Sequence, residues 1–182
     1  MRLERDMTYD EELGAWFGRS RDLHPEAVMK AVFRFDQLPD SAMAFMDAKM
    51  PGHARTLMGA LGAGAADENL DSMVEGAENY HIDFIRADPG NGAALHSHDS
   101  EETFICLTGR WRVTFGDQGE HTVELGYLDG IVCPPGIMRS FENVGTGQSL
   151  LLSILGGKSP GHVVWSESIH QPMRAAWGKS VD

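Results

Sequence analysis

Two histidines separated by one residue, with a glutamate four positions further on, are the residues with the clearest chemical potential in this 182-residue chain. They are His96, His98 and Glu102. On a β-strand, residues i and i+2 face the same side, so both imidazoles are expected to project together. Glu102 follows a turn-like Asp99-Ser100 and begins the next strand, so its side chain can fold back toward the histidines. Two neutral imidazoles and one carboxylate can serve as three facial ligands of a divalent cation.

The alternative for these three residues is a group of polar side chains beside a surface loop. Eight histidines are scattered along the chain, so a histidine pair alone indicates little. The glutamate, the flanking glycines and the aromatic-rich strand that follows make the metal site the stronger hypothesis.

Short apolar and branched runs separated by turn signals occupy the chain from about residue 78 to 156. Many short strands with regular punctuation predict a sandwich or a closed barrel. The predicted strands cover residues 80–87, 103–107, 111–115, 121–125, 131–133, 138–142 and 150–155.

The rest of the chain differs in character from this β-rich part. Before it, residues 28–35 predict a strand, residues 41–50 predict a short helix, and the small residues 59–66 predict a flexible or closely packed connection. After it, residues 163–165 predict one more strand and residues 168–177 a short helix. We therefore divide the chain into an N-terminal extension, a barrel and a tail, at residues 1–77, 78–156 and 157–182.

Charge and cysteine content narrow the class of protein. Fifteen Lys and Arg against 27 Asp and Glu give a net charge of −12, which argues against nucleic-acid binding and against docking on an anionic membrane. Two cysteines, Cys106 and Cys133, exclude a disulfide scaffold and are expected to be buried, inert thiols. With neither a signal peptide nor a membrane span in the sequence, we expect a cytoplasmic protein.

The segment around the histidines resembles the first motif of the cupin superfamily, G-x5-H-x-H-x3/4-E-x6-G. Every fixed position matches, at Gly90, His96, His98, Glu102 and Gly109. The second motif of that family, G-x5-P-x-G-x2-H-x3-N, is matched in part at Pro134, Gly136 and Asn143. Leu128 stands in place of its first glycine, and Arg139 stands in place of its last metal-binding histidine.

The resemblance implies an all-β fold: a cupin-type double-stranded β-helix, or jelly-roll barrel, here with an N-terminal α/β extension. Barrels of this family hold a metal and a small-molecule pocket at the barrel mouth. Many of them dimerise by lending an N-terminal strand to a partner, which makes residues 28–35 the candidate contact of a homodimer.

Arg139 leaves two alternatives for the site. A guanidinium has no free lone pair and cannot ligate a metal, but an inward-facing one needs an anion. In the first alternative, a metal stays on His96, His98 and Glu102, and Arg139 orients a substrate carboxylate. In the second, Arg139 pairs with Glu102, and the pocket is metal-free or vestigial.

The side chains expected to line the pocket are mainly apolar. Phe104 and Cys106 share the strand parity of Glu102, and Phe141 shares that of Arg139. His81 lies on the strand that leads toward the first motif and is a further candidate. An apolar pocket with a few polar groups suits a small aromatic or aliphatic acid.

These features predict a metal-dependent cupin enzyme with dioxygenase-like activity on a small carboxylate-bearing or aromatic substrate. The expected metal is Fe(II), because two histidines and one carboxylate with open positions are typical of non-haem iron oxygenases. Mn, Zn or Ni would instead suit a redox-neutral lyase, isomerase or decarboxylase. A metal-free ligand-binding barrel is the non-enzymatic alternative.

Overall fold

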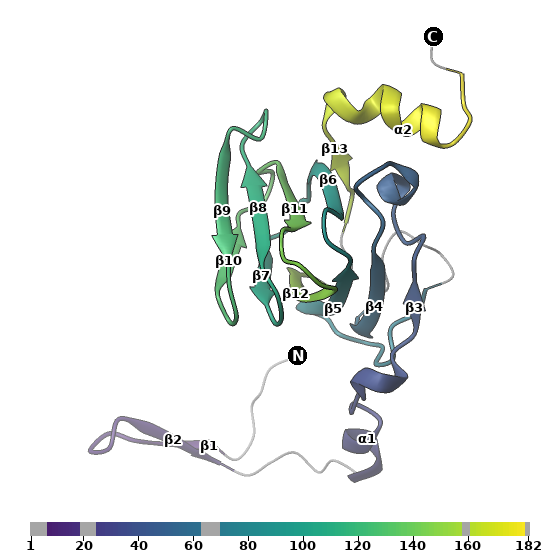
Figure 1. Ribbon diagram of the computed structural model, residues 1–182. Helices are drawn as coiled ribbons and strands as arrows, with labels where there is room; N and C mark the ends of the chain where they lie inside the picture. The colour runs from purple at the N-terminus through teal and green to yellow at the C-terminus, as the bar shows by residue number, and fades with distance from the viewer. Residues whose placement is uncertain (1–6, 19–24, 63–69, 158–160, 181–182) are drawn as a thin grey trace. The chain divides into compact units, whose positions relative to one another are not determined.

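The computed structural model describes residues 7–18, 25–62, 70–157 and 161–180 (Figure 1). The chain forms two compact units, which meet in the sequence between Val32 and Phe33. Each unit is described by itself below.

The N-terminal unit contains an antiparallel hairpin of β1 (Met7–Asp10) and β2 (Ala15–Gly18), followed by the short helix α1 (Pro25–Met29). The strand predicted over residues 28–35 is wrong. Lys30 N–H donates to Glu26 O and Ala31 N–H donates to Val28 O. The backbone groups at the start of this stretch are therefore hydrogen-bonded to nearby residues of the same segment. Branched residues favour a strand only where a neighbouring strand pairs with their backbone groups. Pro25, just before this stretch, is instead well suited to begin the helix α1.

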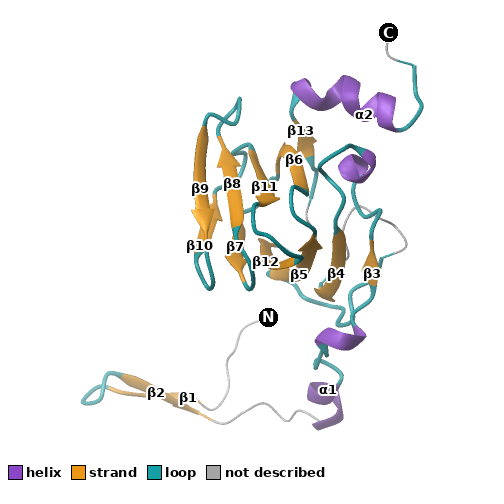
Figure 2. Ribbon diagram, viewed as in Figure 1, coloured by secondary structure: helices purple, strands orange, loops and turns teal. Residues whose placement is uncertain are grey.

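The second unit is built on two antiparallel sheets (Figure 2). One has six strands in the order β10-β7-β12-β5-β4-β3, and the other has five in the order β13-β6-β11-β8-β9. The predicted all-β jelly-roll fold is confirmed. The strands that form the barrel are β5 (Tyr80–Ala87), β6 (Gly92–Ser97), β7 (Glu102–Cys106), β8 (Trp111–Phe115), β9 (His121–Leu125), β10 (Gly130–Cys133), β11 (Arg139–Asn143) and β12 (Ser149–Gly156).

The seven predicted strands agree with these bounds to within one residue at each end, and no range was predicted for β6. Their side chains alternate between buried and partly exposed, as in β5, β7 and β12. The core lies between the two sheets, where Trp111, Val113 and Phe141 of one sheet meet Phe104 and Leu151 of the other.

Two further strands precede residue 78. β3 (Asp40–Ser41) and β4 (Thr56–Leu61) extend the six-stranded sheet beyond β5. The helix predicted over residues 41–50 is wrong, since this stretch holds the end of β3 and the 3-10 turn η2 (Met46–Lys49). The predicted small-residue connection begins inside β4, and residues 63–66 of it lie outside the described residues.

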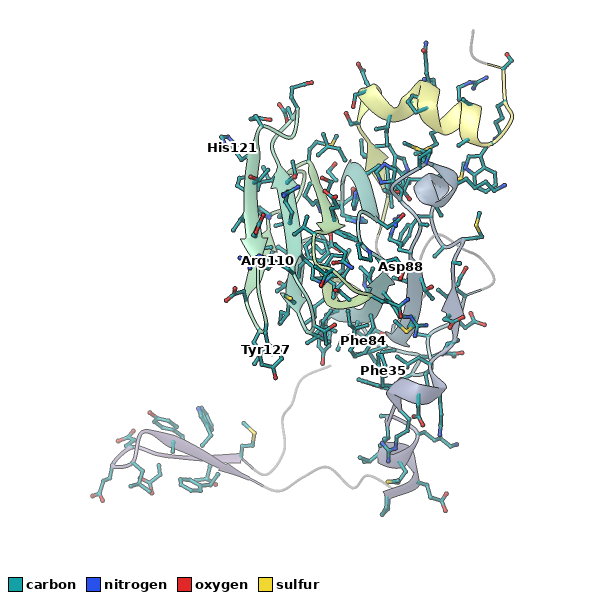
Figure 3. The ribbon with its side chains drawn as sticks, viewed as in Figure 1. Phe35, Phe84, Asp88, Arg110, His121 and Tyr127 are labelled. Carbon is teal, nitrogen blue, oxygen red and sulfur yellow. The ribbon has the colours of Figure 1, made fainter. Side chains whose placement is uncertain are left out.

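Small residues in β4 permit close packing. A Cβ atom at Gly59 would lie 3.0 Å from Ser72 Oγ, so a larger residue would crowd this contact. On the outer side of β5, the ring of Phe84 is covered by Phe35 from the 3-10 turn η1 (Phe35–Gln37), with ring centroids 5.1 Å apart (Figure 3).

The C-terminal segment returns to the barrel through β13 (Val164–Trp165), which pairs with β6 and confirms the predicted last strand. The turn η3 (Glu167–Ile169) and the helix α2 (His170–Ala176) follow. Pro172 lies in the first turn of α2, where a missing N–H costs no helical hydrogen bond. Trp177 Nε1 donates to Met46 O at 2.6 Å, which fastens the end of α2 to η2. Within the described ranges, no helix is long and apolar enough to cross a membrane.

Candidate functional site

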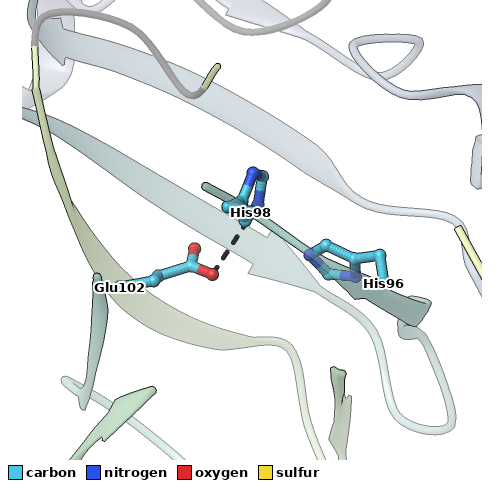
Figure 4. Close-up of side chains that lie close together, drawn as sticks. All are labelled: His96, His98 and Glu102. Carbon is cyan, nitrogen blue, oxygen red and sulfur yellow. Dashed lines mark ion pairs between the residues drawn. The ribbon is translucent and has the colours of Figure 1, made fainter. Parts of the chain in front are cut away.

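The structure brings the three predicted ligand residues together (Figure 4). His96 lies on β6, His98 follows that strand, and Glu102 begins β7. All three are about 5 % exposed or less, and their ligand atoms lie within 4.8 Å of one another. Two ligand atoms that are each about 2.1 Å from one ion lie at most about 4.2 Å apart. The cluster is therefore close to the spacing that one divalent ion requires.

The protonation state of His96 suits a metal ligand. Its Nδ1 lies 2.7 Å from the backbone oxygen of Ala94, and a carbonyl oxygen only accepts hydrogen bonds. Nδ1 therefore carries the proton and Nε2 keeps its lone pair, an arrangement common in metal-binding histidines. Burial, reinforced by repulsion from His98, holds the pKa of His96 well below its usual value, so the ring is neutral at pH 7.

Glu102 is held on both oxygens. Arg139 Nε and Nη2 donate to its Oε2 at 3.0 and 2.7 Å, and Ser153 Oγ donates to its Oε1 at 2.8 Å. His98 Nε2 lies 3.8 Å from the same Oε2. Glu102 is thus oriented by two neighbours before any ligand binds.

Arg139 faces the barrel interior and is fully buried. It lies opposite His96 in the ladder between β11 and β6, and its Nη1 donates to the backbone oxygen of Ile137 at 3.1 Å. Its anionic partner is Glu102, which is the second of the two pairings considered from the sequence.

The donor set fits a divalent metal in ligand type and in the tautomer of His96. Glu102 Oε1 keeps a lone pair beyond its bond from Ser153, whereas Oε2 is engaged by Arg139. The positive charge of Arg139 opposes that of an ion at the same carboxylate. A metal would therefore bind here in competition with the guanidinium.

A cavity opens beside the cluster. Counted with its opening to solvent, it has a volume of about 420 Å³. His81 and Phe141 line it, together with the three ligand candidates. Its other lining residues are Phe45, Arg55, Leu57, Asp83, Ile85, Ala93, Ser153, Leu155 and Trp165.

The other two candidate pocket residues lie elsewhere. Phe104 and Cys106 are fully buried in the core and do not line the cavity. Burial raises the pKa of Cys106, and burial followed by the charge of Glu102 raises the pKa of Cys133 to about 11. Both thiols are therefore protonated at neutral pH, as expected for inert cysteines.

Sequence reasoning missed the nine other lining residues, among them Asp83, Arg55 and Trp165. Asp83 has the same strand parity as His81 on β5, a signal that would have found it. Arg55 donates to both oxygens of the buried Asp47, at 3.0 Å each, and no motif marks that pair. Trp165 reaches the cavity from β13, and its ring centroid lies 5.3 Å from that of His96.

Residues 84–155 match the family model described as a cupin domain. With the fold and the motif residues above, this match shows that the barrel belongs to the cupin superfamily. No curated protein sequence matches the chain.

Several solved structures are similar to this chain at low sequence identity. The polyketide cyclase RemF from Streptomyces resistomycificus is 15 % identical over 80 % of this chain and 92 % of its own, with a TM-score of 0.59. An RmlC-like cupin from Shewanella frigidimarina is 12 % identical over 69 % of this chain and 88 % of its own, with a TM-score of 0.49. An oxalate decarboxylase from Lactobacillus farciminis is 23 % identical over 50 % of this chain and 27 % of its own, with a TM-score of 0.42. The similarity to the polyketide cyclase shows the fold alone.

Proposed function

We propose that this protein is a small-molecule cupin enzyme that uses a divalent metal held by His96, His98 and Glu102. The observation that supports it is the convergence of these three buried side chains at one cavity. Fe(II) is the proposed ion and dioxygenase-like oxidation the proposed reaction, with Mn, Zn or Ni for a redox-neutral reaction. When bound, such an ion supplies Lewis acidity and, as iron, electrons for dioxygen chemistry.

The protein's own groups prepare the site for this role. Ala94 O fixes the proton of His96 on Nδ1, and Ser153 holds one oxygen of Glu102. Arg139 acts as a positioning residue, because it orients the carboxylate and balances its charge. For Arg139 to orient a substrate, as expected from the sequence, it would have to leave Glu102.

Metal content tests the proposal. Protein purified without chelator should contain about one divalent ion per chain, and His96→Ala and His98→Ala should lose it. His121→Ala is the matched control, since His121 is an exposed histidine on β9 and should leave the metal content unchanged. Oxygen consumption with small aromatic compounds then separates oxidation from redox-neutral chemistry. Metal-free wild-type protein would contradict the proposal.

A metal-free ligand-binding barrel is the second candidate, and the pairing of Arg139 with Glu102 favours it. In that case the guanidinium supplies the positive charge that a metal would otherwise bring. Arg139→His distinguishes the two functions, because it removes the competing cation and adds an imidazole. If Arg139→His binds an ion that the wild type lacks, the metal-free barrel is supported. If both proteins contain about one divalent ion per chain, the metal enzyme is supported.

A further inference from the structure

The cavity has little positive charge to offer a ligand. Arg55 is the only arginine or lysine among the described residues that line it, and its guanidinium already holds both oxygens of Asp47. Arg139, next to the cavity, is likewise paired with Glu102. A ligand carboxylate would therefore have to displace a buried carboxylate of the protein to reach the Nη atoms of Arg55 or the Nε and Nη2 atoms of Arg139. Arg55 Nε has no hydrogen-bond partner among the described residues, so it is the one guanidinium donor of Arg55 left for a ligand oxygen.

Three side chains in the cavity wall each have a buried polar atom without a hydrogen-bond partner among the described residues: Asp83 Oδ1, Arg55 Nε and His81 Nδ1. Asp83 supplies the carboxyl oxygen of this group. Asp83 lies on β5 and is 4 % exposed, and no described residue hydrogen-bonds to its Oδ1. Its Oδ2 lies 3.7 Å from His81 Nε2, beyond hydrogen-bond distance. Buried polar atoms are nearly always paired in folded proteins, so an unpaired oxygen at a cavity wall indicates a missing ligand group.

The state of Asp83 favours an uncharged partner. Burial, followed by the charge of Glu102, raises the pKa of Asp83 to about 7. Near neutral pH the carboxyl is therefore partly protonated and can both donate and accept hydrogen bonds. A second carboxylate placed beside it would meet repulsion from Glu102 as well.

Seven of the other lining residues are apolar, and three of these are aromatic. Phe45, Phe141 and Trp165 contribute rings, and Leu57, Ile85 and Leu155 contribute aliphatic surface. Apolar walls with a few buried polar groups suit a ring that carries a hydrogen-bonding substituent.

We propose that Asp83 is a substrate-binding residue that hydrogen-bonds an uncharged hydroxyl or amide group, and that the cavity selects neutral aromatic compounds over aromatic carboxylates. The inference rests on the proposed function, since the ligand occupies the cavity beside His96, His98 and Glu102. It narrows the substrate class from carboxylate-bearing or aromatic compounds to uncharged aromatic ones.

Benzamide and benzoate test this selectivity, because they have nearly the same shape and differ in charge. Binding of each probe to the full-length protein is measured by calorimetry, both as purified and after removal of metal by EDTA. The metal-free arm excludes direct coordination of benzoate by an ion. We expect benzamide to bind at least about tenfold more tightly than benzoate in the metal-free arm.

Variants test the role of Asp83. Asp83→Leu should weaken benzamide binding about tenfold or more, whereas Asp83→Asn, which keeps a hydrogen-bonding amide, should retain most of it. Asp117→Asn is the control, since Asp117 lies exposed in the turn between β8 and β9. If Asp83→Leu does not fold, the ratio of the benzamide and benzoate dissociation constants of the wild type still tests the selectivity.

Benzoate binding as tight as benzamide, unchanged benzamide binding by folded Asp83→Leu, or no binding of either probe up to about 10 mM would overturn the inference. Metal content measured on the same samples keeps the two proposals apart. A metal-free protein that prefers benzamide contradicts the metal enzyme alone, and a metal-containing protein without this preference contradicts the role of Asp83 alone.

Discussion

At the scale of single residues, the site is organised by one buried ion pair. Arg139 replaces a ligand of the usual cupin pattern and binds the carboxylate of Glu102, which the same pattern keeps. Both side chains are almost completely buried, so each depends on the other for its charge. A buried pair of this kind is costly to break from one side because the remaining charge is left without a partner.

We therefore expect Glu102→Gln to lower the free energy of unfolding by about 3–5 kcal/mol in metal-free protein. The double variant Glu102→Gln/Arg139→Gln should be less destabilised than the sum of the two single variants, because it leaves no unpaired charge. Urea unfolding of the wild type and the three variants measures this coupling. Additive effects would show that the pair is not an energetic unit.

Asp83 makes stability depend on pH. Its pKa is raised from 3.8 to about 7, so the folded state holds the proton more tightly than the unfolded state does. The free energy of unfolding should therefore fall as the pH rises from about 4 to above 7. Asp83→Asn removes this contribution, so relative to wild type it should gain stability between pH 5 and pH 8, by at most about 4 kcal/mol.

Urea unfolding in chelating buffer at pH 5 and pH 8 checks the effect. Asp117→Asn, on the surface, should follow the wild-type pH profile. If the free energy of unfolding of Asp83→Asn varies with pH as that of the wild type does, burial does not raise the pKa of Asp83.

At the scale of elements, the antiparallel pairing of β6 with β11 places His96 opposite Arg139. The register shifts between Arg139 and Phe141, and the two strands approach closely at Gly92. A Cβ atom at Gly92 would lie 1.7 Å from the backbone oxygen of Phe141, a distance that no rearrangement of a side chain can relieve.

Gly92→Ala should therefore destabilise the protein by more than about 3 kcal/mol, because the backbone of a central strand must move. Gly147→Ala is a matched control, since nothing lies within 4 Å of a Cβ atom there, and it should change stability by less than about 1 kcal/mol. Thermal unfolding of both variants provides the comparison. Similar midpoints would show that the strands can separate at this point without cost.

Seven of the eight barrel strands were predicted because each carries its own signal, whereas no range was predicted for β6, which begins with the small residues 92–94. β5, β8 and β9 alternate in polarity between clear turns, and their bounds follow directly. β4 could not be found in this way, because its centre holds the small residues Gly59 and Ala60 in place of the branched residues that indicate a strand. Gly59 is small because the strand packs closely against Ser72. For residues 28–35, branched and aromatic composition predicted a strand, but none of the described strands pairs with this stretch.

The site shows the same division between local and distant determinants. His96, His98 and Glu102 could be predicted because they lie within seven consecutive residues and their geometry follows from one strand and one turn. The inward direction of Arg139 followed from its place in the second motif. The pairing of Arg55 with Asp47 depends on how η2 packs against β6, where Ala94 N–H also donates to Asp47 Oδ2, and no local pattern encodes that packing.

At the scale of the whole molecule, the hairpin of β1 and β2 carries large apolar side chains in contact with water. Trp16 is 65 % exposed and Phe17 is 53 % exposed, on opposite faces of β2. A two-stranded hairpin alone is marginally stable in water, and exposed apolar patches commonly mark an interface. The homodimer expected from the family resemblance stays a prediction, and these side chains, rather than a strand over residues 28–35, are its candidate contact.

Sedimentation equilibrium at micromolar concentration should give about twice the 20.0 kDa mass of one chain. Trp16→Ser/Phe17→Ser should shift the equilibrium toward monomer, because it removes apolar area that a partner would bury. Tyr127→Ser is the control, since Tyr127 is 73 % exposed in the turn after β9 and should leave the mass unchanged (Figure 3). A wild-type monomer would contradict the dimer itself. A dimer that survives loss of both aromatic side chains would instead place the interface away from the hairpin, for example at one of the edge strands β3, β9, β10 and β13 of the two sheets.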